Sequence, residues 1–290
     1  MPFAPVIRSQ QTLRRPAVVS GVGYWGGRAN RVELRPAAAG TGVVFVRDDL
    51  PVPVRIPALV ENRVDAVART NLAVAGVTVQ MVEHVLSALA GLAVDCCEIH
   101  VTAEELPGLD GSSHAYVDAI DAAGIESLGA PVVPIVVDRT VRLGDELSWV
   151  EVSPPRFAGL AIEYELDYCH AAIGRQQLKL DVTPGSYREQ LAAARTFLAV
   201  EEAERLQAAG LGLAVGHRDL LVFGDDGPIG NTLRWPDECV RHKMLDLVGD
   251  LALAGQPLHA TVRASRSGHR LNAAAAARMV AEYRDAVAVS

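Results

Sequence analysis

The chain has 290 residues, half of them hydrophobic, which is enough for a large core in one domain or two. Its formal net charge of −8 provides no basic surface of the kind that nucleic acid requires, so we expect no nucleic-acid partner. The four cysteines lack the spacing of a disulfide framework, and no apolar run fits a signal peptide or a membrane span, so we expect a cytoplasmic protein without a transmembrane segment.

The first half of the chain is predicted to consist of short strands followed by helices. Apolar and β-branched runs around Gly-rich bends indicate strands between residues 17 and 80. A mostly apolar helix is expected at 80–92, a strand at 96–102 and a second helix at 112–124. The stretch 126–138 carries two prolines and is the predicted linker between two halves.

The second half repeats this plan, which predicts domains at residues 1–127 and 128–290, each a mixture of α and β structure. Strands come first, helices follow, and a long helix precedes the last strand and the C-terminal helix. The expected strands are 135–144, 147–154, 160–168 and 258–265, and the expected helices are 187–197, 200–210, 237–255 and a segment from 269 onward.

The two central helices also match each other in sequence. VEHVLSALAG, 82–91, aligns without a gap to VRHKMLDLVG, 240–249, so that His84 falls on His242 with a separation of 242 − 84 = 158 residues. Each segment is followed by a strand, a turn with Gly and Ser, and another helix. This weak repeat predicts two similarly folded halves, and if they pack through these helices the two histidines meet at the interface.

The second of these helices adds a carboxylate to the two histidines. His242 and Asp246 are four residues apart, so they lie on one helical face and can hold one divalent metal ion from a rigid element. His84 from the first half completes a set of two imidazoles and one carboxylate. Three protein ligands leave a fourth position open, as in catalytic zinc sites, and Fe²⁺ would accept the same ligands.

Glu83 is next to the first of these histidines but points about 100° away around the helix. From there its carboxylate can act as general base toward a water molecule that a metal activates. A simpler interpretation is that Glu83 and His84 form an ordinary first turn, where the helix dipole favours a carboxylate. The matching pair His242 and Asp246 favours the metal site over this alternative.

A further histidine, His269, is at a loop-to-helix turn near the C-terminus, and Asp250 continues the helical face of Asp246 by one turn. A hydrogen bond to a carboxylate such as Asp250 would raise the pKa of a histidine. A cationic imidazole at His269 would then stabilise developing negative charge and protonate a leaving amine. A single loop histidine is more often an ordinary surface residue, so this assignment depends mainly on a family resemblance.

The sequence resembles the UDP-3-O-acyl-N-acetylglucosamine deacetylase (LpxC) family of lipid A biosynthesis over nearly its whole length. The resemblance rests on the segments LRRPAVVSGVG, TGVVFVRDDL, VEHVLSALAGL, ELPGLDGSSHAYVDAI, ARTF, VRHKMLDLVGDLALAG and SGHRLN, in this order. It implies an α+β fold in which two β-α-α-β halves pack as a sandwich, with the helices between the sheets and zinc at the junction. The implied reaction is hydrolysis of the N-acetyl group of a UDP-linked, acylated amino sugar.

The resemblance also implies a role for each site residue. The metal ligands would be His84, His242 and Asp246, the base Glu83, and the acid or electrostatic residue His269, with Asp250 behind it. Thr196 would hydrogen-bond the carbonyl or acetate oxygen, Phe197 would pack on the sugar, and Lys243 would pair with the diphosphate. In the simplest alternative, Thr196 bonds only the backbone, Phe197 is part of the core and Lys243 faces solvent.

Two segments depart from the family pattern. The early turn, usually G-x-G-L-H-[ST]-G, reads GVGYWGG at 21–27, so Trp25 stands where the family has a histidine. The segment 198–202 reads LAVEE, where the family has aromatic or Met-containing residues that help line an acyl passage. Both changes concern the substrate, whereas the metal set is intact.

Several functions therefore compete. The first is the deacetylase of this family, and the second is a paralogue with a different acylamino-sugar substrate. A third is a non-catalytic protein that binds a sugar nucleotide or a partner, although such a protein has little need of both Glu83 and His269. The last is a structural metal site that only joins two halves, but structural zinc usually has four protein ligands, often cysteine. The sequence predicts no oligomeric state.

Overall fold

The computed structural model describes residues 8–288, with side chains up to residue 282. Its first half contains the strands β2 (Ala17–Val22), β3 (Ala29–Pro36), β4 (Val43–Arg47), β5 (Val54–Pro57) and β9 (Cys97–Val101). They form one sheet in the order β2-β3-β9-β4-β5, antiparallel except for the pair β4 and β9. Buried and exposed residues alternate along β3, so this sheet turns one face to the core.

The second half contains a sheet with the same plan. Its strands are β12 (Val141–Gly144), β13 (Trp149–Ser153), β14 (Leu160–Asp167), β15 (Arg175–Val182) and β19 (Leu258–Ser265). They pair in the order β12-β13-β19-β14-β15, again antiparallel except for β14 and β19, and a sixth strand, β11 (Ile135–Val136), pairs parallel to β19 off this path. The chain therefore uses one strand topology twice.

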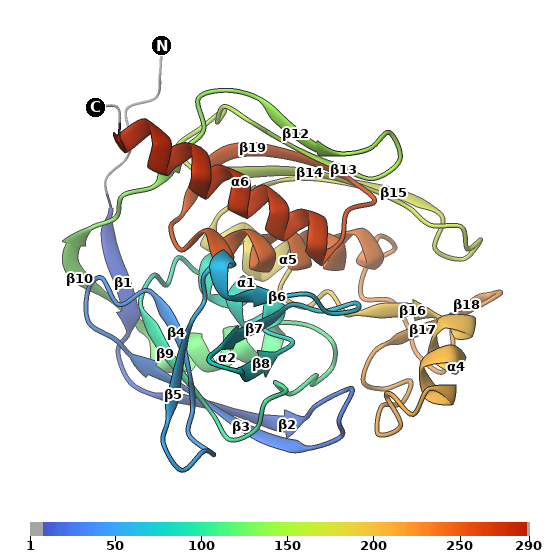
Figure 1. Cartoon of the computed structure of the whole chain (residues 1–290). Helices are drawn as coiled ribbons and strands as arrows, with labels where there is room; N and C mark the ends of the chain where they lie inside the picture. Colours follow the sequence, from blue (N-terminus) through green and yellow to red (C-terminus); the bar gives the residue numbers. More distant parts are fainter. Residues whose placement is uncertain (1–7, 289–290) are drawn as a thin grey trace.

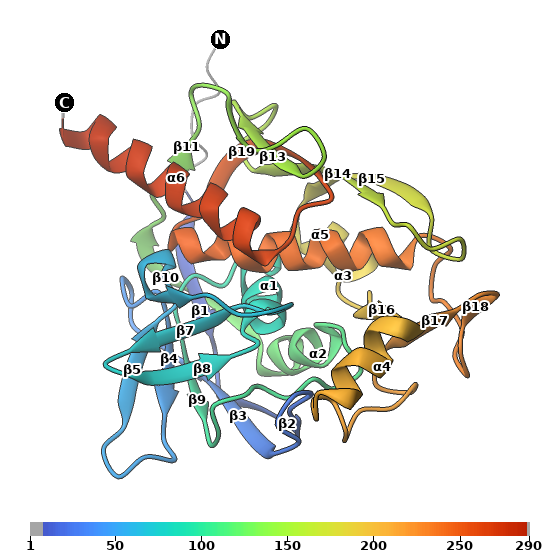
Figure 2. The ribbon, with the colours of Figure 1, turned by 45° about the vertical axis from the view of Figure 1, so that its right-hand side comes forward.

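Four helices lie between the two sheets (Figures 1 and 2). They are α1 (Glu83–Gly91), α2 (His114–Ala123), α5 (Glu238–Leu251) and α6 (His269–Ala288). All residues of α5 except Lys243 are buried, and α1 is buried except at Ala90. Helices that are buried all round belong to the centre of a molecule, in agreement with this position. The prediction of an α+β fold is confirmed.

Close contact between α1 and α5 depends on a glycine. A Cβ atom added at Gly249 would overlap the carbonyl oxygen of Glu83, so only glycine fits at this crossing. Ser87 donates a 2.8 Å hydrogen bond to the carbonyl of Leu245, which is 158 residues away, the separation expected from the internal repeat. The matched segments of the two halves are therefore in contact.

Gly249→Ala is expected to lower the free energy of unfolding by about 1–3 kcal/mol, because the new methyl group must push the two helices apart. Urea unfolding followed by circular dichroism would measure the change. Gly185→Ala is the matched control: Gly185 lies in a helix with ample room for a Cβ, so the substitution should leave stability unchanged or raise it slightly. A Gly249→Ala protein as stable as the wild type would contradict the close crossing.

Each half carries an insertion beside the helix layer. The first is the small sheet of β6 (Arg63–Val64), β7 (Asn71–Val74) and β8 (Val77–Gln80), which follows the 3₁₀ helix η1 (Val60–Asn62). The second contains β16 (Phe197–Ala199), α4 (Val200–Ala208), β17 (Leu221–Gly224) and β18 (Gly227–Pro228), and it projects on the right in Figure 1. A second 3₁₀ helix, η2 (Ala252–Ala254), ends α5 at Gly255.

Two predictions of local structure are wrong in part. The helix expected at 187–197 is confined to α3 (Pro184–Gln190), and Phe197 already belongs to β16. Between them, Arg195 forms a buried ion pair of 2.7 Å with Glu238, so a tertiary contact overrides the helical sequence pattern. The linker expected at 126–138 is largely strand, because β10 (Ile125–Pro131) pairs with β1 (Ser9–Leu13) and β11 (Ile135–Val136) pairs with β19. The domain boundary after residue 127 stays a prediction.

Candidate active site

The helix crossing places two histidines and an aspartate around one point. His84 from α1 and His242 and Asp246 from α5 each offer one ligand atom, and these atoms all lie within 4.8 Å of one another. The centroids of the two imidazole rings are 5.3 Å apart and the rings are nearly perpendicular. All three residues are buried. The structure thus brings together the three residues that the sequence predicts as metal ligands.

The spacing of the donor atoms suits a divalent ion, and one of these atoms has no hydrogen-bond partner. Asp246 Oδ1 lies 3.8 Å from His84 Nε2 and 3.3 Å from His242 Nε2. Ligands about 2.0–2.1 Å from a tetrahedral zinc ion are about 3.3–3.4 Å from each other, which is close to both distances. The same Asp246 oxygen is buried and has no hydrogen-bond partner, and such an atom is costly unless something else binds it.

The protonation states of these residues also suit a metal. Burial, and then the charge of His242, lowers the pKa of His84 to about 3, and burial lowers the pKa of His242 as well. Burial alone would raise the pKa of Asp246, but His242 and Lys243 outweigh it and hold that pKa below the usual range. His242 Nδ1 lies 3.2 Å from the carbonyl oxygen of Ala194, which leaves Nε2 free for a ligand role. Neutral imidazole and ionised carboxylate are the forms that bind metals.

Glu83 faces the same site from the first turn of α1. Its Oε2 accepts a 2.9 Å hydrogen bond from the backbone N–H of Thr70. Burial raises the pKa of Glu83 to about 7, although the charge of His269 opposes this rise. Glu83 does begin the helix, as the simpler interpretation expects, yet its buried carboxyl group titrates near neutral pH. A carboxyl group of this kind is suited to accept a proton during catalysis.

His269 is the first residue of α6 and is paired with a buried carboxylate. Its Nδ1 lies 2.9 Å from Asp250 Oδ2, and Asp250 also accepts hydrogen bonds from Thr70 (2.6 Å) and Asn272 (2.9 Å). Burial lowers the pKa of His269, but the charge and hydrogen bond of Asp250 outweigh burial and raise it to about 9. The imidazole is therefore cationic at neutral pH, as a proton donor requires.

Sequence reasoning missed Thr70 and Asn272. Thr70 bonds Glu83 through its N–H and Asp250 through its hydroxyl, so it fixes the spacing between the two groups. No motif points to Thr70, because it lies in an irregular segment 13 residues before Glu83. Asn272 lies three residues after His269 in the segment SGHRLN, so that segment offered a signal for it.

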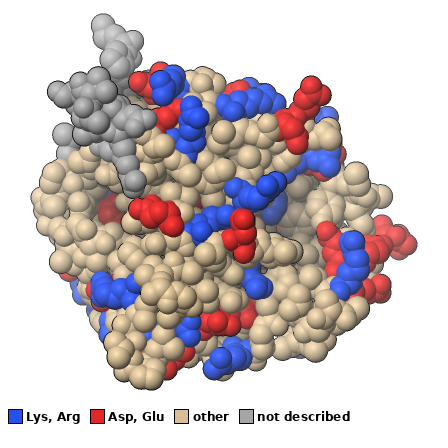
Figure 3. Space-filling model, viewed as in Figure 1, with Lys and Arg blue, Asp and Glu red and all other residues tan. Residues whose placement is uncertain are grey.

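One cavity of about 670 Å³ joins these groups, and both insertions contribute to its wall. Among the residues that line it are Glu83, His84, Thr196, Phe197, His242, Lys243, Asp246 and His269. Asp250 is fully buried behind His269 and does not line it. Figure 3 shows the surface hollowed to the right of centre, where this cavity lies beside the α4 insertion.

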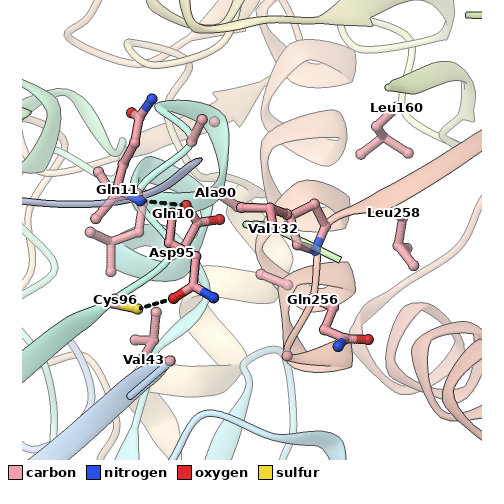
Figure 4. A pocket seen from close by; sticks show the side chains of 18 of the residues that line it. Gln10, Gln11, Val43, Ala90, Asp95, Cys96, Val132, Leu160, Gln256 and Leu258 are labelled. Atoms are coloured by element: carbon pink, nitrogen blue, oxygen red, sulfur yellow. Dashed lines mark hydrogen bonds between the residues drawn. The ribbon is translucent and has the colours of Figure 1, made fainter. Parts of the chain in front are cut away.

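A second cavity of about 650 Å³ lies between the two halves, with α1 on one side and β14 and β19 on the other (Figure 4). It contains none of the site residues predicted from the sequence. Its polar groups largely bond one another; for example, the N–H of Gln11 donates to Asp95 at 2.8 Å and Cys96 Sγ donates to Gln10 at 3.4 Å. The first cavity is therefore the candidate active site.

A comparison with known protein families agrees with this geometry. The model of the LpxC family, described as UDP-3-O-acyl N-acetylglycosamine deacetylase, matches residues 10–281 of the 290-residue chain. The chain belongs to the LpxC family. Family membership makes it a deacetylase, and thus a hydrolase, in general terms. Among the described residues, the helices are all too short or too polar to cross a membrane.

Lys243, which the LpxC resemblance assigns to a diphosphate, is engaged within the protein. Its Nζ lies 2.8 Å from Asp246 Oδ2, and its side chain is 23% exposed. Burial lowers the pKa of Lys243, but Asp246 outweighs it and the pKa lies above its usual value. The residue is therefore a charged part of the cavity wall and not a solvated helix face. An ammonium group has three N–H donors, so this ion pair leaves room for a substrate oxygen.

Thr196 and Phe197 both border the cavity. The Thr196 hydroxyl donates a 3.0 Å hydrogen bond to the carbonyl of Gly111, as the simplest alternative expects. A hydroxyl also accepts hydrogen bonds, so this contact leaves its lone pairs available. Phe197 is buried and packs edge-on against the ring of His242, with centroids 6.3 Å apart. It therefore contacts a predicted metal ligand and is also part of the core.

The two departures from the LpxC pattern both lie in the cavity wall. Trp25 lines the cavity, and the turn that carries it is held by Glu105, which accepts hydrogen bonds from the N–H groups of Trp25 (2.6 Å) and Gly26 (2.7 Å). On α4, in the insertion of the second half, Glu202 also lines the cavity and accepts a 2.5 Å hydrogen bond from Tyr168. The cavity wall therefore differs here from the family pattern, whereas the predicted metal ligands do not.

Proposed function

We propose that this protein is a zinc-dependent hydrolase that removes the N-acetyl group from a UDP-linked 3-O-acyl-N-acetylglucosamine, in lipid A biosynthesis. Membership in the LpxC family supports the deacetylase reaction. The observation that carries the metal requirement is the buried ligand set of His84, His242 and Asp246, with its unpartnered carboxylate oxygen. Fe²⁺ would accept the same donor atoms. The cytoplasmic location stays a prediction.

His84, His242 and Asp246 would hold the ion. When bound, zinc would polarise the acetyl carbonyl group and lower the pKa of a water molecule. Glu83 would accept the proton of the attacking water, since its carboxyl group titrates near neutral pH and borders the cavity. Its hydrogen bond from Thr70 fixes the orientation of the carboxylate.

His269 would donate the proton that the leaving amine requires. The charge of Asp250 keeps the imidazole protonated at neutral pH, and Asn272 and Thr70 hold Asp250 in place. The cationic ring would also stabilise negative charge as it develops on the acetyl oxygen. Thr196 would hydrogen-bond that oxygen, Phe197 would pack on the sugar, and Lys243 would pair with a substrate phosphate.

The experiment that tests this proposal is hydrolysis by the purified, zinc-loaded protein. With a UDP-linked 3-O-acyl-N-acetylglucosamine, acetate and a free amine should form in equal amounts. Treatment with a chelator should stop the reaction, and zinc should restore it. Zinc-loaded protein that binds the substrate and releases no acetate would contradict the proposal.

A specific observation favours a second candidate function. Trp25 lines the cavity where the family pattern has a smaller histidine, and Leu198, Val200 and Glu202 of the altered segment 198–202 line it too. A paralogue that hydrolyses a different acylamino sugar would have such a cavity, and so would a protein that only binds a sugar nucleotide or a partner. A panel of N-acylated amino sugars separates these cases, because the paralogue would release an acid from another member and the binding protein from none.

Asp250→Asn is expected to move the alkaline limit of activity to lower pH. His269 must be protonated, and its pKa of about 9 is raised by Asp250, so wild-type activity should fall as pH rises through about 9. Without that charge, burial still lowers the pKa of His269, so the pKa and the alkaline limit of activity should both move to lower pH. The pH dependence of kcat/KM measures the shift.

The matched control for this prediction is Asn272→Ala, which removes another hydrogen bond to Asp250 but keeps its charge. Its alkaline limit should stay near that of the wild type. An Asp250→Asn enzyme with an unchanged alkaline limit would show that another group sets it.

A further inference from the structure

Arg69 is a cation without a fixed counter-ion beside the active-site cavity. Its Nε is buried and has no hydrogen-bond partner. Among the described side chains, residues 8–282, no carboxylate forms an ion pair with its guanidinium, although the charges of Glu105, Glu83 and Glu104 act on it through space. An arginine keeps its charge in proteins, so this half-buried cation is a costly group unless a ligand binds it.

Trp25 supports this cation from one side. The Cζ atom of Arg69 lies 4.5 Å from the centroid of the Trp25 ring, in the geometry of a cation–π contact. Glu105 accepts hydrogen bonds from the N–H groups of Trp25 and Gly26 and forms no ion pair with Arg69, although its charge acts on Arg69 through space. Gly23 makes room for this carboxylate, because a Cβ at Gly23 would overlap it. The turn therefore holds the indole in place and leaves the arginine unpaired.

The backbone around Arg69 belongs to the cavity wall. Ala68, which precedes it, lines the cavity together with Trp25 and Glu83. Thr70, which follows it, bonds Glu83. Arg69 thus lies between a residue that lines the cavity and a buried residue that bonds Glu83. Of the cations that line this cavity, Lys243 already pairs with Asp246 and Arg270 is exposed.

We propose that Arg69, held against Trp25, is a specificity-determining residue that binds a phosphate oxygen of the substrate's diphosphate. The indole occupies one flat face of the guanidinium and, since Nε is buried, leaves the terminal NH₂ groups for an anion. Arginine binds phosphate through two parallel hydrogen bonds, which a lysine cannot match. The identity of the anion rests on the proposed function. Of this pair, Trp25 lines the cavity and Arg69 contacts its ring without lining the cavity itself.

Titration calorimetry with UDP tests the proposal on the full-length, zinc-loaded protein. Arg69→Ala should weaken UDP binding about 10- to 100-fold, the range expected for charged hydrogen bonds. Uridine, which lacks the diphosphate, should bind both proteins equally. Arg69→Lys should lie between them, because it keeps the charge but loses the fork and the flat face. The control is Arg28→Ala, an exposed arginine of the same turn, which should bind UDP like the wild type.

Trp25 variants test whether the pair acts as a unit. Trp25→Phe should keep most of the UDP affinity, and Trp25→Ala should lose part of it. Adding Trp25→Ala to Arg69→Ala should then cost less than it does alone, which is the non-additivity of coupled residues. Independent, fully additive effects of Trp25→Ala and Arg69→Ala would overturn the paired role.

Two outcomes separate this proposal from the proposed reaction. UDP binding that is unchanged in a folded Arg69→Ala protein overturns the role of Arg69, even if acetate release is normal. Weaker UDP binding in Arg69→Ala supports it, even if the protein proves to hydrolyse a different acylamino sugar. Thermal unfolding of each variant confirms that the comparison is between folded proteins.

Discussion

Glu83→Gln should lower kcat by about 10²- to 10⁴-fold, the usual contribution of a positioned acid–base group. Glutamine has the shape of the glutamate and can still accept the hydrogen bond from Thr70, but it cannot take a proton from water. The three predicted metal ligands are untouched, so zinc content and substrate KM should change little. Acetate release under saturating substrate, together with metal analysis of the same sample, measures both effects.

Stability provides an independent readout of the same substitution in the metal-free protein. Burial raises the pKa of Glu83 from 4.5 to about 7, so the folded state binds this proton more tightly than the unfolded state does. The wild type should therefore lose stability relative to Glu83→Gln as pH rises from about 4.5 to 7, and the difference should then stay constant. The exposed residue Glu146 offers a control, since Glu146→Gln should change neither activity nor this pH dependence. Hydrolysis by Glu83→Gln at nearly the wild-type rate would end the role of Glu83 as base.

His84→Ala should abolish both metal binding and hydrolysis. It removes one of three ligands, and it removes the only ligand that the first half contributes to this set. The remaining pair, His242 and Asp246, would hold a divalent ion far more weakly. We expect about one zinc ion per wild-type chain after dialysis, and close to none for the variant. Metal analysis and acetate release on the dialysed proteins measure the two losses.

The control for this substitution is His114→Ala, which removes an exposed histidine from α2. This variant should keep its metal and its activity. A His84→Ala protein that retains zinc with wild-type affinity would show that the ion is held elsewhere, and the catalytic assignments of Glu83 and His269 would then have no metal to act beside.

The sequence could predict that His84, His242 and Asp246 come together, because two of them are local to one helix and the third lies on the helix that matches it. The spacing of His242 and Asp246 fixes them on one helical face, and the ungapped match of α1 to α5 indicated where His84 would lie. Glu83 and His269 came from motifs around them. The structure adds the distances between these residues, their burial and the unpartnered Asp246 oxygen, which the sequence pattern of a helix cannot predict.

The remaining features depend on contacts between distant segments. Thr70 joins Glu83 to Asp250, which is 180 residues later, and nothing in the sequence around Thr70 indicates this. The helix expected at 187–197 ends early because Arg195 pairs with Glu238. Lys243 was expected to face a diphosphate, but its first partner is Asp246. In each case the partner of a charged or hydroxyl side chain is distant in the sequence or set by tertiary packing, and local propensity does not predict it.

The predicted metal site depends on how the two halves are aligned, because its ligands come from both helices that cross at Gly249. Ser87 and Leu245 are bonded at a separation of 158 residues, and His84 and His242 face each other at the same separation. A slip of one half along the other by a single helical turn, about 5.4 Å, would carry the imidazoles out of reach of a common ion. The proposed metal binding therefore requires that α1 and α5 keep their relative position.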